Sequence, residues 1–351
     1  MKAAVVEEIA KPLVVHRDWP DPDCGADEAV IRVGANGICR SDYYVWQGGW
    51  PWLGIALPAP IVLGHEYCGV VEEVGSATTR VRKGDRVVVP FNHSCGRCES
   101  CQAGHQNVCS DIRLPMLHHS GGFGQYTKVA RADVNVVPLP ESVSFVHAAA
   151  LGCRFMTAWH GVVDQAGVQA GEWVAVFGCG GVGIAAVDIC TALGANVIAV
   201  SRTPDKLALA KELGAVHTVN AAEGKAAEQV TELTGGGAHV SIDALGDAET
   251  AIPAVLSLRA RGRHLRLGTS SQKQGGTIPL PVDLFVFREL RFVGSFGMQA
   301  ARYPEMLRMV ESGKLHPGQM VRGTVSIDEA GDVLKSMTTY NAVGMRVITE
   351  W

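Results

Sequence analysis

A glycine-rich turn between a strand and a helix constrains the fold of this chain more than any other feature. The turn, Gly178-Cys179-Gly180-Gly181-Val182-Gly183, follows the strand-like run Trp173–Phe177 and precedes an alanine-rich helical stretch. In such a G-x-G-x-x-G pattern the first glycine permits a tight turn, the second lets a pyrophosphate approach the backbone, and the third lets the helix pack on the strand. The pattern favours a dinucleotide site over a glycine turn with no ligand. It assigns the phosphates to the helix N-terminus at Gly178, Gly180, Gly181, Val182 and Gly183.

The residues around this turn alternate between strands and helices. NVIAVS, VHTVN, HVSIDALG and GRHLRLGT read as strands, whereas PDKLALAKELGA and the stretch around Ala248–Leu258 read as helices. This alternation predicts an α/β unit, a doubly wound Rossmann coenzyme domain with a parallel sheet. We expect that domain to span 155–296, because the alternation stops after Phe296. A helix over Arg302–Ser312 and a last strand over Arg346–Thr349 are expected beyond it.

The first part of the chain has a different pattern. Short strand-like runs such as AVIRV, GVVEEVG and DRVVVP are separated by glycine and proline, which predicts a mainly β domain over 1–154. We expect the segment 297–351 to return to it. A chain of 351 residues exceeds one ordinary core, which also favours two domains.

Composition and charge exclude several functional classes. Hydrophobic residues make up 47% and charged residues 19%, as in globular proteins. The formal net charge of −4 gives no reason to expect a nucleic acid or a membrane surface as partner. The N-terminal MKAAVVEEIAKP holds no apolar run long enough for a signal peptide or a membrane helix. We therefore expect a cytoplasmic protein.

Four of the ten cysteines form a local cluster, C-x2-C-x2-C-x7-C, at Cys95, Cys98, Cys101 and Cys109. Tetrahedral zinc takes four thiolates from such a turning loop, to which Gly96 and Gly104 are suited. The alternatives are a loop of free thiols and an iron–sulfur cluster, although iron–sulfur runs usually differ in their last spacing. The spacing predicts a closed, structural zinc site within a lobe over 90–112.

A second set of metal-binding residue types is spread along the chain. Cys39 opens Cys39-Arg40-Ser41-Asp42, His65 precedes Glu66, and Cys153 lies in LGCRFMTAWHG. Each has a commoner explanation when taken alone, since a lone cysteine is usually a small buried hydrophobe. Together they offer two thiolates and an imidazole, which hold zinc with one position open. An open zinc lowers the pKa of an alcohol, so that hydride release becomes feasible near neutral pH.

Taken in this order, the motifs resemble the zinc-containing medium-chain alcohol dehydrogenases over essentially the whole chain. The pattern G-H-E-x2-G-x5-G is met by Gly64, His65, Glu66, Gly69 and Gly75, and the four-cysteine lobe matches in spacing. The resemblance implies a GroES-like fold for the β domain and hydride transfer between NAD(P) and an alcohol, aldehyde or ketone. It implies catalytic zinc ligands at Cys39, His65 and Cys153, and hence two zinc ions per subunit.

The resemblance also implies roles for residues beside the ligands. Glu66 would lie behind the metal, able to exchange onto it, and Asp42 would orient His65. Ser41 would take the substrate proton. Many relatives carry a histidine where this chain has Tyr44. A phenol with a pKa of about 10 is a poor proton shuttle near neutral pH, so we expect water to take that step.

Coenzyme contacts outside the glycine turn follow from the same resemblance. A pyrophosphate contact is expected from Arg40, and packing against the nicotinamide from Thr157 and Val182. Backbone around Gly268 and Gly294–Phe296, including Ser295, would hold the carboxamide. A further phosphate contact is assigned to Arg346, although an exposed arginine on a terminal strand is also ordinary.

The end of the second strand of the coenzyme domain predicts NADP(H) in preference to NAD(H). An NAD site normally has Asp or Glu there, which accepts hydrogen bonds from the ribose hydroxyls. Here NVIAV is followed by Ser201 and Arg202, which can donate to a 2′-phosphate. The pair also resembles that of NADP-using bacterial relatives. The alternative is a relaxed site that accepts both coenzymes.

The sequence constrains the substrate pocket and the subunit assembly less than it constrains the coenzyme turn and the metal ligands. Apolar residues that suggest a broad pocket are Trp46, Trp50, Trp52, Phe91 and Met116, but the tryptophans fit the packing of a loop or interface equally well. The resemblance implies a homotetramer or homodimer in which the strand near Leu290–Ser295 pairs across a two-fold axis. Two other functions remain open: a zinc-dependent reductase of a conjugated enal, and a dinucleotide-binding protein without catalysis. Intact metal ligands argue against the latter and against a zinc-free quinone reductase.

Overall fold

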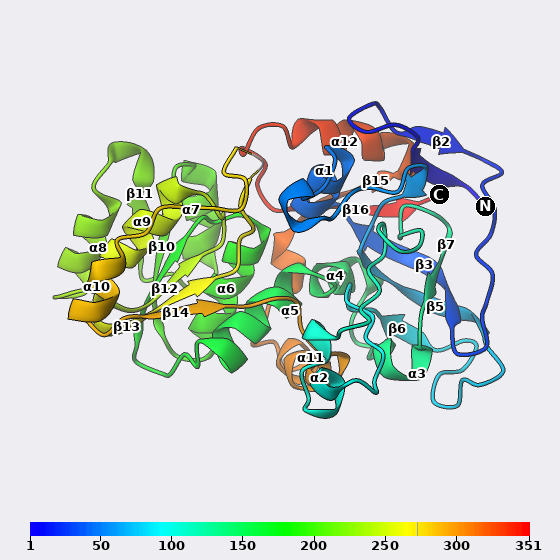
Figure 1. Cartoon of the computed structure of the whole chain (residues 1–351), viewed down its shortest axis with the longest axis horizontal. Helices are drawn as coiled ribbons and strands as arrows, with labels where there is room; N and C mark the ends of the chain where they lie inside the picture. The colour runs from blue at the N-terminus through cyan, green and yellow to red at the C-terminus, as the bar shows by residue number, and fades with distance from the viewer. Residues whose placement is uncertain (272) are drawn as a thin grey trace. The chain divides into compact units, whose positions relative to one another are not determined.

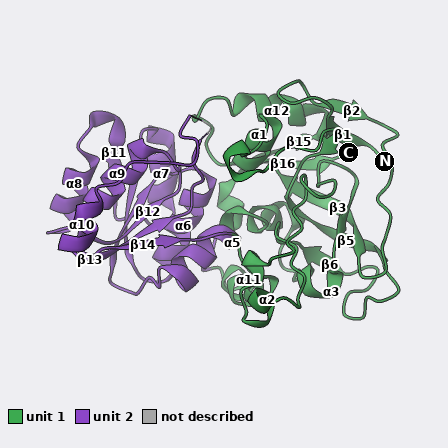
Figure 2. Ribbon diagram, viewed as in Figure 1, with its two compact units in different colours: residues 1–156, 297–313, 317–351 green, residues 157–296, 314–316 purple. Residues whose placement is uncertain are grey.

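The computed structural model describes residues 1–271 and 273–351, and the chain divides into two compact units (Figures 1 and 2). Unit 1 contains Met1–Met156, Gly297–Gly313 and Pro317–Trp351. Unit 2 contains Thr157–Phe296 together with the short segment Lys314–His316. The chain therefore leaves unit 1 and returns to it near residue 297.

Unit 1 is built mainly on antiparallel strands. Its larger sheet has the order β15-β16-β3-β5-β6-β8, with β7 also paired to β3. These strands are β3 (Ala29–Gly37), β5 (Glu66–Val74), β6 (Arg86–Val88), β7 (Tyr126–Val129), β8 (Val137–Pro138), β15 (Val321–Ser326) and β16 (Met345–Glu350). A smaller sheet has the order β2-β1-β4, from β1 (Ala3–Val6), β2 (Val14–His16) and β4 (Ile61–Val62). The mainly β, GroES-like character expected from the sequence is confirmed.

Short helices join the strands of unit 1. They are α1 (Arg40–Trp46), α2 (Glu99–Gln102), α3 (Ala132–Asn135), α4 (Phe145–Ala148), α5 (Arg154–Trp159), α11 (Tyr303–Glu311) and α12 (Ala330–Ser336). Helix α5 crosses the boundary between the units, because unit 2 begins at Thr157. One apolar core of unit 1 joins the first strands to the C-terminal segment, through Ala4, Val45, Leu63 and Leu334.

Unit 2 is a parallel sheet in the order β11-β10-β9-β12-β13-β14. Its strands are β9 (Trp173–Phe177), β10 (Asn196–Ser201), β11 (His217–Asn220), β12 (Ala238–Asp243), β13 (Leu258–Arg266) and β14 (Arg291–Gly294). Its helices are α6 (Gly181–Ala192), α7 (Pro204–Glu212), α8 (Ala226–Leu233), α9 (Ala248–Leu256) and α10 (Val282–Phe287). The strand order reverses between β9 and β12, where doubly wound sheets bind their ligands at the carboxyl ends of the strands. The predicted Rossmann fold is confirmed.

Several elements differ from the sequence-based expectation in detail. The expected helix at Arg302–Ser312 is α11, and the last strand is β16, each within a few residues of the predicted limits. Helix α9 ends at Leu256 because β13 already begins at Leu258. Among the elements that were not predicted are α8, α10, α12 and β15. Within the described parts of the chain, every helix is too short or too polar to cross a lipid bilayer.

Candidate metal centres and coenzyme turn

The fold of unit 1 brings together the four dispersed residues Cys39, His65, Glu66 and Cys153. One ligand atom from each lies within 4.8 Å of the other three, and all four side chains are buried. Cys39 caps the N-terminus of α1 after β3, His65 and Glu66 stand at the start of β5, and Cys153 directly precedes α5. Three separate elements therefore converge on one buried cluster, which we call the dispersed cluster.

The carboxylate of Asp42 orients two of these residues. It accepts hydrogen bonds from the backbone N–H of Cys39 at 2.7 Å, from that of Gly64 at 3.2 Å and from Nδ1 of His65 at 2.9 Å. Because Nδ1 donates to Asp42, the other ring nitrogen of His65 keeps its lone pair toward the cluster. That atom, Nε2, is buried and has no hydrogen-bond partner among the described residues. An orphaned imidazole nitrogen between two thiols fits a zinc ion.

The side chains of the dispersed cluster have shifted pKa values, and the shift at Cys39 favours its metal-binding form. The hydrogen bond from the Cys153 thiol holds the pKa of Cys39 well below its usual range, although burial acts against this shift. Burial alone would lower the pKa of His65, but the Asp42 carboxylate raises it well above its usual value. A lowered thiol pKa favours the thiolate, which is the form that binds metals.

Arg154 is a buried residue of the cluster that the sequence analysis missed. Its guanidinium donates to Oε2 of Glu66 at 2.7 Å and to the carbonyl oxygen of Ile38 at 2.7 Å. Burial raises the pKa of Glu66 well above its usual range, and the Arg154 charge opposes that shift. The second oxygen of Glu66, Oε1, is buried and unpaired within the described chain. The one available signal was a charged residue inside an otherwise apolar run.

The four cysteines of the lobe form a second cluster, which we call the closed cluster. Their sulfur atoms all lie within 4.8 Å of one another, with Cys95 to Cys101 at 3.9 Å and Cys98 to Cys109 at 3.8 Å. Four sulfurs placed tetrahedrally at about 2.3 Å from zinc are about 3.8 Å apart, whereas a disulfide needs about 2.05 Å. The spacing therefore fits zinc.

Backbone N–H groups point at the sulfurs of the closed cluster. Cys109 Sγ accepts from the N–H of Cys95 at 3.2 Å and from that of Asp111 at 3.3 Å, and Cys95 Sγ accepts from the N–H of Cys98 at 3.3 Å. Hydrogen bonds led by the backbone N–H of Cys101 lower the pKa of Cys98 to about 5. Gly96 and Gly104 have φ of +72° and +85°, so the loop needs glycine there, as the sequence predicted.

The glycine turn of unit 2 has the geometry expected of a coenzyme turn. Gly178 follows β9 with φ of +92°. A Cβ atom added to Gly183 would lie 1.9 Å from the carbonyl oxygen of Gly178, so only glycine lets α6 start this close to the strand. A Cβ atom added to Gly180 would meet nothing within 4 Å, which leaves the space before the turn open. The helix begins at Gly181 and Val182.

At the end of β10, the neighbouring strand, Ser201 is buried and its hydroxyl accepts from the N–H of Thr203 at 3.3 Å. The exposed Arg202 follows, and its guanidinium lies 3.5 Å from a carboxylate oxygen of Glu249 in α9. Gly178 donates its N–H to the carbonyl oxygen of Val200, so the glycine turn and Ser201 share one edge of the sheet.

The remaining predicted coenzyme residues are placed as follows. Thr157 is buried in α5. Gly268 lies just after β13 and packs against the backbone of Leu245, where an added Cβ would lie 2.4 Å from the carbonyl carbon. The hydroxyl of Ser295 is buried without a partner among the described residues. Arg346 is exposed on β16 and donates to the carbonyl oxygen of Arg322.

The predicted pocket residues fall into two groups. Phe91 packs its ring edge-on against His65, with the ring centres 5.9 Å apart, so it lies next to the dispersed cluster. Trp46 and Met116 are instead buried in the apolar core of unit 1, where Trp46 donates its indole N–H to the carbonyl oxygen of Lys11. Trp50 packs against the same core, and Trp52 is half-buried in a short 3₁₀ turn.

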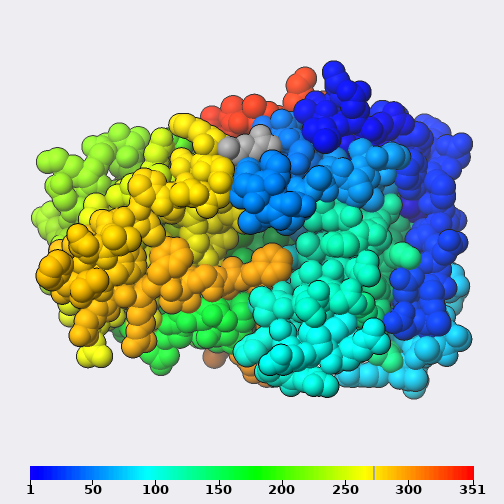
Figure 3. Space-filling view, in the orientation of Figure 1, coloured from blue at the N-terminus to red at the C-terminus, as the bar shows by residue number. Residues whose placement is uncertain are grey.

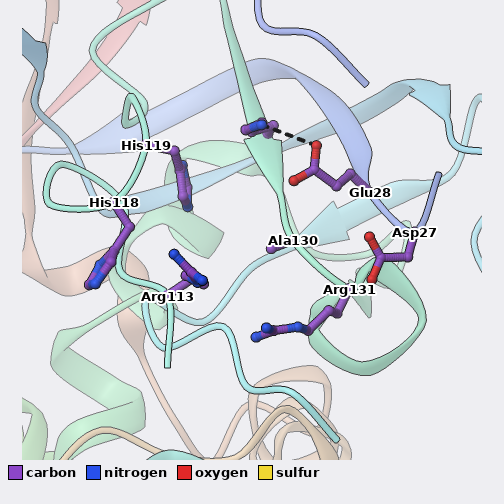
Figure 4. A pocket seen from close by; sticks show the side chains of 8 residues that line it. Asp27, Glu28, Arg113, His118, His119, Ala130 and Arg131 are labelled. Carbon is purple, nitrogen blue, oxygen red and sulfur yellow. Dashed lines mark hydrogen bonds and ion pairs between the residues drawn. The ribbon is translucent and has the colours of Figure 1, made fainter. Parts of the chain in front are cut away.

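Unit 1 also has a polar hollow of about 280 Å³ that none of the predicted site residues lines (Figure 4). Its lining residues are Asp27, Glu28, Arg113, His118, His119, Lys128, Ala130 and Arg131. Lys128 pairs with Glu28 at 3.1 Å, and Arg131 pairs with Asp111. The hollow is thus bordered by ion pairs and lies outside the candidate sites described above.

Fold and site together define a zinc-dependent, nicotinamide-linked oxidoreductase, and comparison with known proteins specifies the family. Residues 25–141 match the alcohol dehydrogenase GroES-like domain, and residues 181–312 match the zinc-binding dehydrogenase domain. An alcohol dehydrogenase of Geobacillus stearothermophilus is 33% identical over 333 residues, covering 95% of each chain. The chain belongs to the zinc-containing medium-chain alcohol dehydrogenase family, as the sequence motifs predicted.

Solved structures agree with this assignment. A zinc-binding dehydrogenase of Sinorhizobium meliloti 1021 bound to NADP is 32% identical, with a TM-score of 0.87, covering 99% of this chain and 98% of that one. An NAD-dependent alcohol dehydrogenase is also 32% identical with a TM-score of 0.87, and the match covers 100% of both chains. The chain is accordingly an oxidoreductase that transfers a hydride between NAD(P) and an alcohol or carbonyl compound.

Proposed function

We propose that this protein oxidises an alcohol with NADP⁺, and reduces the corresponding carbonyl compound with NADPH, at the dispersed cluster. Cys39, His65 and Cys153 would hold the catalytic zinc, and the closed cluster would hold a second, structural zinc. The observation that carries the proposal is the buried Nε2 of His65, which lacks a partner in the described chain and faces two thiols and a carboxylate. When bound there, zinc supplies a Lewis acid that lowers the pKa of the substrate hydroxyl.

Ser41 is the residue we assign to the substrate proton. Its hydroxyl oxygen lies 4.0 Å from the sulfur of Cys39, so it stands at the edge of the cluster. In alcohol oxidation the substrate hydroxyl gives its proton to Ser41, which passes its own proton to water, while the hydride goes to the nicotinamide. We assign no step of this path to Tyr44, because its hydroxyl is engaged with that of Tyr340 at 3.1 Å.

Phe91 is the pocket residue that the geometry supports best, because its ring contacts that of His65. An apolar side chain beside the ligands favours substrates with an apolar or aromatic group next to the hydroxyl. Steady-state rates with a series of primary, aromatic and cyclic alcohols test this proposal. A Phe91→Ala variant should lose rate with aromatic alcohols more than with ethanol, and equal losses would contradict the assignment.

We propose NADP(H) as the preferred coenzyme. Strand β10, next to the glycine turn, ends at Ser201 and is followed by Arg202, so no acidic residue stands at the strand end. An acidic residue there would repel a 2′-phosphate. In the structure Arg202 pairs weakly with Glu249, and both side chains are mostly exposed. Such a pair costs little to break, so the guanidinium can turn to a phosphate.

The coenzyme preference is tested by kcat/KM for NADP⁺ and NAD⁺. Exchanging Ser201→Asp together with Arg202→Ile should reverse the preference by about ten- to a hundredfold, the scale of one charge-assisted hydrogen bond. Glu249→Gln serves as the matched change of a neighbouring charge and should raise the preference for NADP⁺ slightly. A parent enzyme that favours NAD⁺ tenfold would contradict the assignment.

We also propose that two copies pair through the edge strand β14, giving a homodimer or a homotetramer. Strand β14 ends the sheet of unit 2, and the preceding helix α10 carries exposed apolar side chains, with Val286 75% and Phe287 84% exposed. Residues 282–296, yellow-orange in Figure 3, lie on the visible surface of this unit. Paired edge strands with an apolar flank bury both features at once.

Light scattering of the Phe287→Asp variant tests this interface. The variant should have a lower mass than the parent, whereas Leu53→Asp, a charge placed on an exposed apolar residue of unit 1, should not. A parent that is monomeric at micromolar concentration would rule the interface out.

We further propose a cytoplasmic location, because the cysteines of the two clusters must stay reduced to bind zinc and the cytoplasm keeps thiols reduced.

A further inference from the structure

Arg40 has an unusual environment for a cation. Its guanidinium carbon lies 3.8 Å from the ring centre of Tyr340, 4.7 Å from that of Tyr43 and 5.5 Å from that of Tyr44. We call these three rings the tyrosine cage. Two of them belong to α1, the helix that Arg40 itself begins, and the third belongs to the segment between α12 and β16. The cage therefore joins residues that are some 300 positions apart in the sequence.

The backbone next to Tyr340 holds the same guanidinium. One of its nitrogens donates to the carbonyl oxygen of Met337, and the carbonyl oxygen of Thr339 is 3.5 Å away. The hydroxyl of Tyr340 in turn contacts that of Tyr44 at 3.1 Å, which fixes the ring over Arg40. The arginine is thus held by ring faces and carbonyl oxygens in one orientation.

The charge of Arg40 is nevertheless not neutralised. Within residues 1–271 and 273–351, its polar contacts are to carbonyl oxygens and tyrosines, and no carboxylate pairs with it. Its Nε is buried and has no hydrogen-bond partner in the same part of the chain. A planar guanidinium has five N–H donors, so stacking on a ring leaves donors free in its plane. An oriented and unneutralised cation of this kind is suited to an anionic ligand.

We propose that Tyr340 is a positioning residue for the coenzyme, which acts by holding Arg40 in the orientation that binds the pyrophosphate. This inference rests on the proposed function, in which Arg40 contacts that group. The ring of Tyr340 lies closest to the guanidinium and is the part of the cage supplied by a segment remote from α1. Without it, Arg40 would have to be ordered at the moment of binding, at a cost in affinity.

The inference predicts a specific pattern in the dissociation constant of NADPH, measured by fluorescence titration. Tyr340→Leu should raise it by roughly three- to thirtyfold, the range expected for loss of a cation–π contact. Tyr340→Phe keeps the ring and should stay within about twofold of the parent. The KM for the coenzyme should rise with little change in kcat, which a general loss of structure would not produce.

Two controls separate this role from a merely structural one. Arg40→Gln should weaken NADPH binding at least as much as Tyr340→Leu, and combining the two should add little, because Tyr340 acts through Arg40. Adenosine 2′-phosphate lacks the pyrophosphate, so it should bind all variants with the same affinity. Melting temperature and zinc content check the fold, and Tyr340→Met replaces the leucine variant if the latter does not fold.

Three results would overturn the inference: unchanged NADPH binding in Tyr340→Leu, an equal loss in Tyr340→Phe, or a full further loss when Tyr340→Leu is added to Arg40→Gln. Failure of the proposed function would look different. In that case the parent itself would bind neither NADPH nor NADH, or Arg40→Gln would bind NADPH as the parent does.

Discussion

The two candidate metal clusters of unit 1 are assembled in different ways. The closed cluster takes all four sulfurs from one loop, between Cys95 and Cys109, and backbone N–H groups of the same loop point at them. The dispersed cluster needs β3, β5 and α5 to be in place, because its members lie between Cys39 and Cys153. A site made by one loop contributes to folding locally, whereas a site made by remote elements is positioned by the fold around it.

This difference indicates which of the two clusters can take part in catalysis. The closed cluster offers four equivalent sulfurs and leaves no position for a substrate. The dispersed cluster combines two thiols, an imidazole and a carboxylate, and one of its buried nitrogens lacks a partner in the described chain. Loss of a ligand from the dispersed cluster should therefore lower turnover, whereas loss of a ligand from the closed cluster should lower the stability of the fold.

The largest effect on turnover is expected from Cys39→Ala or His65→Ala. Each removes a ligand of the proposed catalytic zinc, so kcat/KM should fall by at least about 10⁴-fold, or about 5.5 kcal/mol. Elemental analysis should show one zinc per subunit in place of two. Cys24→Ala, a thiol outside both clusters, is the matched control and should change neither quantity. A variant that kept two zinc ions would contradict the ligand assignment.

The next effect concerns stability of the dispersed cluster. Arg154→Met removes the partner of a fully buried carboxylate, that of Glu66, and should lower the free energy of unfolding by about 3–5 kcal/mol. Adding Glu66→Gln should restore much of the loss, because the unpaired charge is then gone. Urea denaturation measures both, with exposed Arg346→Met as the control. If Arg154→Met unfolded like the parent, the buried pair would not be needed to hold Glu66.

Sequence patterns predicted what is local and missed what is long-range. The glycine turn and the closed cluster are complete within short segments, so spacing alone indicated both. Arg154 meets Glu66 across 88 positions, and Tyr340 meets Tyr44 across 296. No periodicity links such pairs, and the ligand roles of the dispersed cluster came from a family resemblance. The residues of the dispersed cluster are brought together by the pairing of strands that are far apart in the sequence, and no short sequence pattern indicates that pairing.

The same reasoning explains the elements that were missed. The run Val282–Phe287 is mostly apolar, a pattern that fits a buried strand as well as a helix, and it forms α10 with exposed side chains. Helix α12 is only seven residues long and packs on the core through Ala330 and Leu334. Short elements of this kind are decided by tertiary packing rather than by their own sequence pattern.

An intermediate effect on turnover is expected at the edge of the dispersed cluster. Ser41→Ala should lower kcat for alcohol oxidation by roughly 10²-fold, the usual scale for loss of a proton-transfer group. Tyr44→Phe should change kcat by less than about twofold, because the Tyr44 hydroxyl is engaged with that of Tyr340 and water takes the proton from Ser41. Zinc content should stay at two in both variants. A large loss of kcat in Tyr44→Phe alone would show that the phenol carries the proton after all.

The smallest effect on turnover is expected from Cys98→Ala, although its effect on stability should be clear. Removing one of four thiolates opens the closed cluster, and the zinc that organises this loop is lost or loosely held. The melting temperature should fall by at least about 5 °C. The remaining folded subunits should keep kcat within about threefold, because the dispersed cluster draws no ligand from the loop. Calorimetry and an assay corrected for active sites measure the two quantities on the same preparation. An unchanged melting temperature with lost turnover would reverse the roles of the two clusters, since the lobe would then serve the chemistry and not the fold.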